Sequence, residues 1–292
     1  MPQARNGDTI LNYDTFGDPG DPTLLLVMGL TAQMTAWDEH LCAMLADEGF
    51  HVVRFDNRDC GLSSKSEGPP PDLTELAMAL LSGSAVPDVP YTLSEMASDA
   101  VAVVTAAGGG PAHVVGASMG GMIAQMCAIE HPEVVASLTS IMSTTGATDV
   151  GQPEPAALEA LMKPPPADRD GYIERSVEVT RVIAGPLVDD DEVRRSSGAA
   201  YDRSFYPEAA SFQMAAIAKT GDRTERLGQV RAPTLVIHGA VDPLIPPSGG
   251  EATARAIPGA RLEVLDKMGH DLPAQLWPDI VSLIADHARS AA

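Results

Sequence analysis

Cysteine is scarce in this sequence. The 292 residues include three cysteines, Cys42, Cys60 and Cys127, and their positions lack the spacing of metal ligands. Three thiols cannot all pair with one another, so the pattern favours reduced, mostly buried side chains over a disulfide framework. No metal site is expected.

Basic residues are also few. The sequence has 19 lysines and arginines against 40 aspartates and glutamates, which gives a formal net charge of −21. A surface this acidic repels phosphate backbones and anionic lipid headgroups, so nucleic acid is excluded as an expected partner. The charge by itself favours solubility rather than a particular function.

Long apolar runs are absent as well. No stretch reaches the roughly 18 apolar residues that suit a membrane-spanning helix. The first ten residues, M-P-Q-A-R-N-G-D-T-I, contain no apolar segment of the kind found in secretory signals. We therefore expect a cytoplasmic protein without an integral membrane segment. With 45% hydrophobic residues, the chain should form one large or two smaller globular domains.

Short apolar runs do occur, and their alternation with helical patterns predicts the fold class. Such runs, separated by helices, are typical of an α/β protein with a mostly parallel sheet buried on both faces. The expected strands are Thr23–Met28, His51–Phe55, Ala112–Val115, Val135–Ile141, Thr234–His238 and Arg261–Leu265.

Helix signals stand between these runs. The tetrapeptides T-A-W-D at Thr35 and T-L-S-E at Thr92 predict helix starts, the second as a capping box. Residues Met119–Ile129 are apolar nearly all round, which indicates a buried helix.

Residues 144–228 differ from the rest of the chain. Helical, polar-rich stretches replace the strand-helix alternation there, and the alternation returns afterwards. We therefore expect one α/β core, formed by residues 1–143 and 229–292, that is interrupted by a mainly helical cap insertion. A separate second domain is the alternative.

The stretch V-V-G-A-S-M-G-G lies between an expected strand and the expected buried helix. This is the context of a G-x-S-x-G nucleophile elbow, in which a sharp turn lifts the Ser118 hydroxyl clear of the sheet. Gly116 and Gly120 would avoid collisions with the neighbouring strand and helix. The alternative is a glycine-rich turn without chemistry or a nucleotide loop, although the G-x-G-x-x-G and G-x-x-x-x-G-K-[ST] patterns are absent.

A serine nucleophile needs a general base, and the base needs an acid that orients it. Among seven histidines, His270 is the candidate base, because its loop D-K-M-G-H-D follows a strand at the edge where α/β sheets hold ligands. Asp242, in H-G-A-V-D-P, is the candidate acid, and a turn aspartate before proline is its alternative. Asp266 and Asp271 are rivals, but both lie so near His270 in sequence that reaching its far nitrogen would require strain.

The chain order of Ser118, Asp242 and His270 is that of a hydrolase triad. An oxyanion hole would complete the site. The candidate donors are the backbone N–H groups of Met119, directly after the serine, and of Leu30, in the loop M-G-L-T-A-Q after the first expected strand.

The sequence also resembles the α/β-hydrolase superfamily over nearly its whole length. The resemblance is carried by L-L-L-V-M-G-L, R-F-D-N-R-D-C-G-L-S, H-V-V-G-A-S-M-G-G-M-I-A-Q, P-T-L-V-I-H-G-A-V-D and M-G-H-D-L-P. Within the superfamily the chain is similar to the aclacinomycin methylesterase group and to the mycobacterial lipase/esterase G group. Met28 stands before Gly29 at a position where the wider superfamily usually has histidine. This difference affects the lining of the pocket more than the mechanism. The charged run Asp56–Asp59 is expected to be a structural loop, with Arg58 bridging nearby carbonyls or carboxylates.

The resemblance implies that Ser118, Asp242 and His270 form the triad, that Leu30 and Met119 bind the oxyanion, and that the insertion is a cap. It implies a cofactor-free serine carboxylic-ester hydrolase of the EC 3.1.1 class, which acts on a small-molecule ester through an acyl-enzyme. The alternatives are a methylesterase on a polyketide-like substrate, and a thioesterase, lactonase, acyltransferase or perhydrolase with the same triad. A ligand-binding receptor on the same scaffold is the alternative outside the enzymes.

Overall fold

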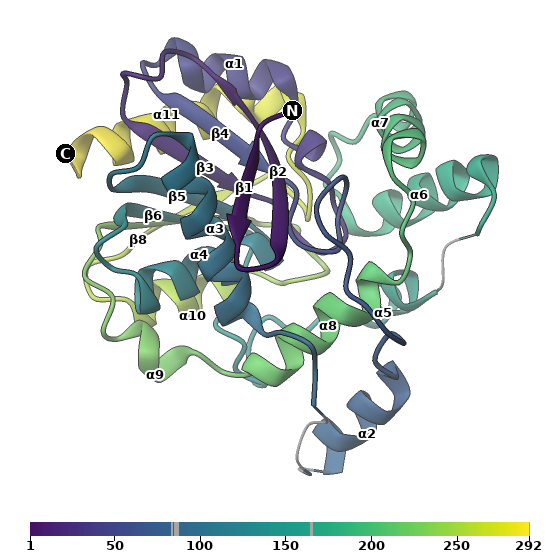
Figure 1. The fold of residues 1–292 in the computed structure, drawn as a ribbon. Helices are drawn as coiled ribbons and strands as arrows, with labels where there is room; N and C mark the ends of the chain where they lie inside the picture. The colour runs from purple at the N-terminus through teal and green to yellow at the C-terminus, as the bar shows by residue number, and fades with distance from the viewer. Residues whose placement is uncertain (83, 85–87, 164–165, 292) are drawn as a thin grey trace.

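The protein is built on one eight-stranded sheet (Figure 1). A computed structural model describes residues 1–82, 84, 88–163 and 166–291. The strand order is β1-β2-β4-β3-β5-β6-β7-β8; the pairs from β4 onward are parallel, and β1 and β2 add an antiparallel edge. The strands are β1 Gln3–Asn6, β2 Thr9–Phe16, β3 Thr23–Val27, β4 His51–Phe55, β5 Ala112–Ala117, β6 Val135–Ile141, β7 Thr234–Gly239 and β8 Arg261–Leu265.

Burial of the central strands explains why apolar runs in the sequence predicted them. Every residue of β3, β4, β5 and β7 is buried, as a parallel strand covered on both faces requires. The predicted mostly parallel sheet is confirmed. The edge strands β1 and β2 were not predicted, because in T-I-L-N-Y-D-T-F polar side chains interrupt the apolar ones and no apolar run forms.

Helices cover both faces of the sheet (Figure 1). Helices α1 and α11 pack on one face, while α3, α4 and α10 pack on the other. The prediction of helices on both faces is confirmed. The helices outside the segment between β6 and β7 are α1 Glu39–Asp47, α2 Leu73–Ser82, α3 Leu93–Ala107, α4 Met119–Glu130, α10 Ser248–Ala256 and α11 Trp277–Ser290, with short 3-10 turns η1 Met34–Ala36 and η2 Ala274–Leu276.

One of the two predicted helix starts is wrong. The capping box at Thr92 is present, and its hydroxyl accepts a hydrogen bond from the Ser94 N–H. Thr35 instead lies in η1, and α1 begins only at Glu39. The extended backbone of Trp37 breaks the helical path, and the Asp38 carboxylate then caps α1 by accepting from the His40 N–H at 2.7 Å.

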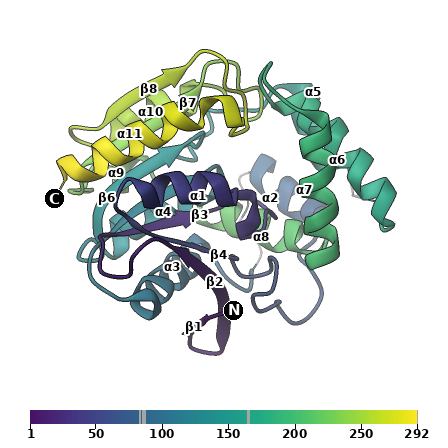
Figure 2. The same cartoon turned by 90° about the horizontal axis from the view of Figure 1, so that it is seen from above.

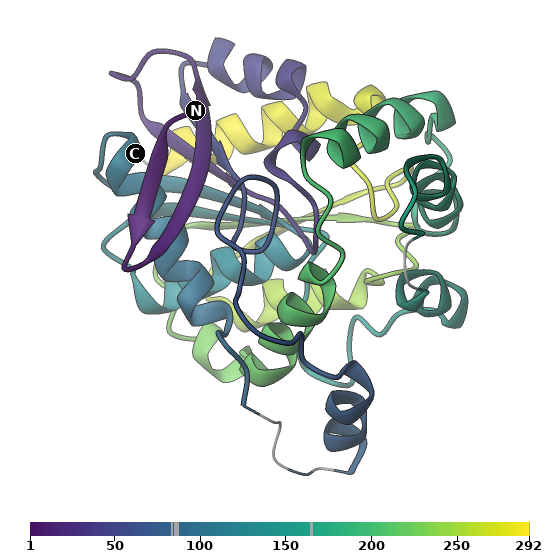
Figure 3. The same cartoon turned by 45° about the vertical axis from the view of Figure 1, so that its right-hand side comes forward.

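A helical segment separates β6 from β7. Figures 2 and 3 show its helices α5, α6 and α7 to one side of the sheet rather than over either helical face. The segment's helices are α5 Pro155–Met162, α6 Arg169–Ile183, α7 Asp190–Arg203, α8 Ala209–Thr220 and the short α9 Thr224–Leu227.

The segment leaves and rejoins the core at one place. The Arg223 N–H donates to the Thr145 carbonyl at 2.9 Å, so the outgoing and returning chains lie side by side. The Arg223 guanidinium, only 1% exposed, donates to the carbonyls of Thr144 at 2.7 Å and Gly221 at 2.9 Å. Burial lowers the pKa of Arg223 to about 10.

The cysteines and the lengths of the helices test two further predictions. The three cysteines are buried and unpaired, as predicted, and burial raises the pKa of each thiol to about 12. Among the described helices, none combines the length and the apolar character that a bilayer crossing demands.

Candidate active site

Ser118 occupies a strained turn between β5 and α4. Its backbone angles are φ 57° and ψ −122°, a region that a residue with a side chain rarely adopts. The flanking glycines make this turn possible. A Cβ at Gly116 would lie 2.1 Å from the Gly120 carbonyl oxygen, and one at Gly120 would lie 2.1 Å from the Val27 carbonyl oxygen. The G-x-S-x-G spacing is thus a steric requirement for packing the elbow against β3.

Three predicted residues meet at this turn. The Ser118 hydroxyl lies 2.9 Å from His270 Nε2, and the Nδ1 atom of the same imidazole lies 2.8 Å from Asp242 Oδ2. His270 stands on the loop after β8, and Asp242 on the loop after β7. Because a carboxylate only accepts hydrogen bonds, Nδ1 carries the imidazole proton and Nε2 presents a lone pair to the hydroxyl.

The Asp242 carboxylate is fixed by its own turn. Its Oδ1 atom accepts the backbone N–H groups of Leu244 and Ile245, each at 2.9 Å, and its side chain is 0% exposed. The second oxygen is thereby aimed at the imidazole of His270. The carboxylate has one orientation, so the histidine has one favoured tautomer.

A second histidine lies behind the acid. The His238 side chain is fully buried, with Nε2 2.7 Å from the Ile245 carbonyl oxygen and 3.7 Å from Asp242 Oδ2. Burial lowers the pKa of His238, so its ring is neutral and Nε2–H donates to that carbonyl. The sequence carries no pattern that marks His238 as a contact of the Asp242 turn.

The two rival aspartates do not reach the imidazole. Asp266 is exposed, and Asp271 turns its Oδ1 atom to the N–H groups of Gly185 and Gly269, each at 3.0 Å. Burial raises the pKa of Asp271 above its ordinary value. Asp271 therefore joins the His270 loop to the start of the α6–α7 connection.

The two predicted oxyanion donors lie beside Ser118. A Cβ built on Gly29 would be 3.4 Å from Ser118 Oγ, so the chain that leads into Leu30 passes next to the hydroxyl. Met119 follows the serine as the first residue of α4. Within the described residues, neither the Leu30 nor the Met119 N–H has an acceptor in the protein. An N–H group without an acceptor in the protein is what an oxyanion donor requires.

The charged run Asp56–Asp59 is structural, as predicted. Asp56 is fully buried and accepts the Arg203 guanidinium at 2.7 Å and the Met34 N–H at 2.9 Å. Arg58 pairs with the buried Asp99 at 2.6 Å. The contact between Asp56 and Arg203 was not predicted, because residues 144–228 contain no motif that identifies Arg203 as a partner of Asp56.

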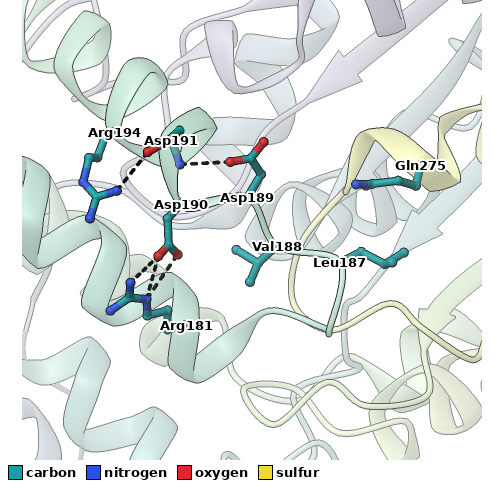
Figure 4. Close-up of a pocket in the computed structure, with 8 residues that line it drawn as sticks. All are labelled: Arg181, Leu187, Val188, Asp189, Asp190, Asp191, Arg194 and Gln275. Atoms are coloured by element: carbon teal, nitrogen blue, oxygen red, sulfur yellow. Dashed lines mark hydrogen bonds and ion pairs between the residues drawn. The ribbon is translucent and has the colours of Figure 1, made fainter.

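A separate surface cleft of about 710 Å³ lies between the α6–α7 region and η2, which carries Gln275 (Figure 4). Its charged groups are largely paired with one another, since Arg181 binds Asp190 and Arg194 binds Asp191. Neither a serine nor a histidine lines it.

Comparison with known proteins agrees with this architecture. Residues 22–274 match the family described as alpha/beta hydrolase fold. The chain is similar to rhodomycin D methylesterase DnrP of Streptomyces peucetius, with 30% identity over 98% of this chain and 97% of that protein. It is also similar to rhodomycin D methylesterase DauP of Streptomyces sp. strain C5, with 31% identity over 94% of this chain and 93% of that protein.

Solved structures give the same picture of the fold. The enol-lactonase from Burkholderia xenovorans LB400 superposes with a TM-score of 0.75, covering 99% of this chain and 100% of that chain at 21% identity. At this level of identity the likeness concerns the fold alone.

Proposed function

Because this chain belongs to the alpha/beta hydrolase fold family, we propose that it is a serine hydrolase that cleaves carboxylic esters. The observation that carries the proposal is the continuous relay from Ser118 through His270 to Asp242, with links of 2.9 and 2.8 Å. Hydrogen bonds of this length and order are what a serine nucleophile, its base and an orienting acid require.

The first half of the reaction forms an acyl-enzyme. Ser118 Oγ attacks the ester carbonyl carbon while His270 Nε2 accepts the hydroxyl proton. The same proton then passes to the leaving alcohol as the C–O bond breaks, which leaves the acyl group on Ser118. Asp242 stabilises the imidazolium that exists between these two transfers.

The second half regenerates the serine. A water molecule gives a proton to His270 and attacks the acyl carbon, and His270 returns the proton to Ser118 as the acid departs. In both halves the carbonyl oxygen becomes negative, and the N–H groups of Leu30 and Met119 are the proposed donors that stabilise it. Removing one donor of this kind costs about 100- to 1,000-fold in rate.

We assign the helical segment 144–228 the role of a cap over this site. Two contacts support the assignment. The Ile183 carbonyl at the end of α6 accepts the His270 N–H at 2.8 Å, and Arg203 at the end of α7 binds the buried Asp56. Segments of the insertion therefore touch the loop that carries the base and the loop that follows β4.

The test is hydrolysis of p-nitrophenyl esters of increasing acyl length by the wild type and by Ser118→Ala. We expect the variant to lose at least about 1,000-fold in kcat. Ser137→Ala is the matched control, because it removes a buried hydroxyl that binds His113 in β5, away from the elbow. Equal rates for the wild type and Ser118→Ala would refute the proposal.

A narrower candidate is methyl-ester hydrolysis on a polyketide-like substrate. The two rhodomycin D methylesterases cover nearly the whole chain, and the insertion contains an aromatic cluster that suits a planar substrate. In this cluster the ring centroids of Tyr201 and Phe205 are 4.7 Å apart, and that of Tyr172 lies 5.5 and 5.6 Å from them. The test compares methyl and butyl esters of one aromatic acid; a preference for the butyl ester would refute this candidate alone.

A further inference from the structure

We propose that Gln213, on α8 of the helical segment, is a positioning residue for the oxyanion hole. Because Gln213 contacts the turn that carries Leu30, ester hydrolysis depends on α8 being docked against the core. The inference rests on the proposed function, since it concerns how the Leu30 N–H is held for the reaction at Ser118.

The turn that carries Leu30 is strained. The Ala32 N–H donates to the Gly29 carbonyl at 3.3 Å, which closes a four-residue turn, and its third residue, Thr31, has φ 58°. A positive φ at that position is the signature of a type II turn and favours glycine. A β-branched residue adopts it at a cost and keeps it only where the surroundings hold it.

Gln213 supplies that hold. Its side chain is fully buried, and Oε1 accepts the Thr31 N–H at 2.7 Å. The Nε2 atom of the same amide donates to the Arg58 carbonyl at 3.0 Å and lies 3.2 Å from Cys60 Sγ. One side chain of the insertion thus joins the Leu30 turn to the loop after β4.

A second contact holds the far end of the same turn. Gln33 Nε2 donates to the carbonyls of Ala200 at 2.7 Å and Ser204 at 2.9 Å, both at the end of α7. Gln33 Oε1 accepts from Arg203 at 2.6 Å. The turn and the residue after it are therefore attached to the insertion at two positions, Thr31 and Gln33, with Ala32 between them.

This attachment fixes the direction of the Leu30 N–H. Leu30 directly precedes Thr31, so relaxation of the Thr31 backbone would rotate the peptide planes around Leu30. Withdrawal of α8 removes the acceptor of the Thr31 N–H and frees the turn to relax. Oxyanion donors work only when they are already in place, and a shift of about 1 Å can cost about 100-fold in rate.

The test uses substitutions that change the Gln213 hydrogen bonds while keeping the side chain's bulk or polarity. Gln213→Met removes the acceptor, and Gln213→Asn keeps an amide that is one methylene too short to reach Thr31. We expect each to lower kcat about 10- to 100-fold with KM changed less than about 2-fold. Gln213→Glu restores an oxygen that accepts the Thr31 N–H and should recover part of kcat.

Gln125→Met is the matched control. Gln125 is another fully buried glutamine, on α4, where it donates to Ser140 Oγ at 3.3 Å and accepts from Arg223 at 3.3 Å. Gln125→Met removes the amide of a fully buried glutamine, as Gln213→Met does, but Gln125 does not contact the Leu30 turn. We expect its kcat to stay near the wild-type value, with all rates measured well below the melting temperature of each variant.

A trifluoromethyl ketone separates positioning from a general structural effect. Ser118 Oγ adds to the ketone carbon, its proton passes to His270, and the carbonyl oxygen becomes an oxyanion in the hole. The corresponding secondary alcohol binds without forming an oxyanion. The Gln213→Met and Gln213→Asn variants should weaken ketone binding in proportion to the loss of kcat and leave alcohol binding unchanged.

Two results would overturn the inference: a kcat for Gln213→Met within about 2-fold of Gln125→Met, or equal losses of affinity for ketone and alcohol. If Gln213→Met does not fold, Gln213→Asn decides by the same criteria. Failure of the proposed function is a different outcome, because Ser118→Ala would then hydrolyse esters at the wild-type rate.

Discussion

Replacing Asp242 by asparagine tests the tautomer of the catalytic base. In the wild type, Oδ1 accepts two backbone N–H groups, from Leu244 and Ile245, and Oδ2 faces His270 Nδ1 at 2.8 Å. Only the carbonyl oxygen of an asparagine can satisfy those two N–H groups. Its NH2 group must therefore face Nδ1, which can then only accept, and the imidazole proton moves to Nε2.

This change of tautomer removes the basic nitrogen from the serine. With its proton on Nε2, His270 cannot accept the Ser118 proton, although every heavy atom keeps its position. A triad with the wrong tautomer loses about 10,000-fold in kcat, which is about 5.5 kcal/mol of transition-state stabilisation at about 1.4 kcal/mol per factor of ten. The melting temperature should change little, because the shape and the two turn hydrogen bonds are retained.

Two measurements check this prediction. Initial rates on a p-nitrophenyl ester give the loss of kcat, and ¹⁵N chemical shifts of labelled histidine give the tautomer of His270 in each protein. We expect protonated Nδ1 in the wild type and protonated Nε2 in Asp242→Asn. A variant within 10-fold of the wild type, or an unchanged tautomer, would refute the reasoning.

Three further outcomes follow from the structure. Gly29→Ala should lower kcat/KM about 10- to 100-fold in ester hydrolysis, because its Cβ would lie 3.4 Å from Ser118 Oγ in the space of the substrate carbonyl; an unchanged value would place the carbonyl elsewhere. Asp271→Asn should raise the melting temperature at neutral pH, because burial raises the pKa of the wild-type carboxyl and its ionisation opposes folding. This gain should shrink toward zero below about pH 4, where the carboxyl is protonated in both the folded and the unfolded state; a gain independent of pH would contradict it. In the native protein a thiol reagent at pH 8 should label none of the three cysteines, and it should label all three in denaturant; the residues concerned are Cys42, Cys60 and Cys127.

Sequence reasoning succeeded where a residue's role depends on local pattern. Ser118 could be found because strand, glycine spacing and buried helix are all consecutive in the chain. His270 and Asp242 could be found because the ends of parallel strands meet at one edge of a sheet, so position along the chain predicts proximity. The proximity of these three residues is now seen in the structure, while their catalytic roles remain a proposal.

Sequence reasoning failed where a role depends on a distant partner. Nothing in residues 144–228 marks Gln213 or Arg203 as contacts of the core, because a single buried amide or guanidinium has no periodicity and no motif. The edge strands β1 and β2 were also not predicted, because polar side chains interrupt their apolar ones. The start of α1 was placed at Thr35, although Asp38 caps the helix.

The junction at Arg223 has a consequence for protein engineering. Since the helical segment departs and returns through neighbouring backbones, replacing it changes no distance that the sheet must span. A segment of another length could be grafted between Thr145 and Arg223 if it preserves the acceptor carbonyls of the guanidinium. If the segment acts as the proposed cap, such a graft would exchange substrate preference as one block. The grafted segment would also need a side chain that replaces Gln213 as the acceptor of the Thr31 N–H.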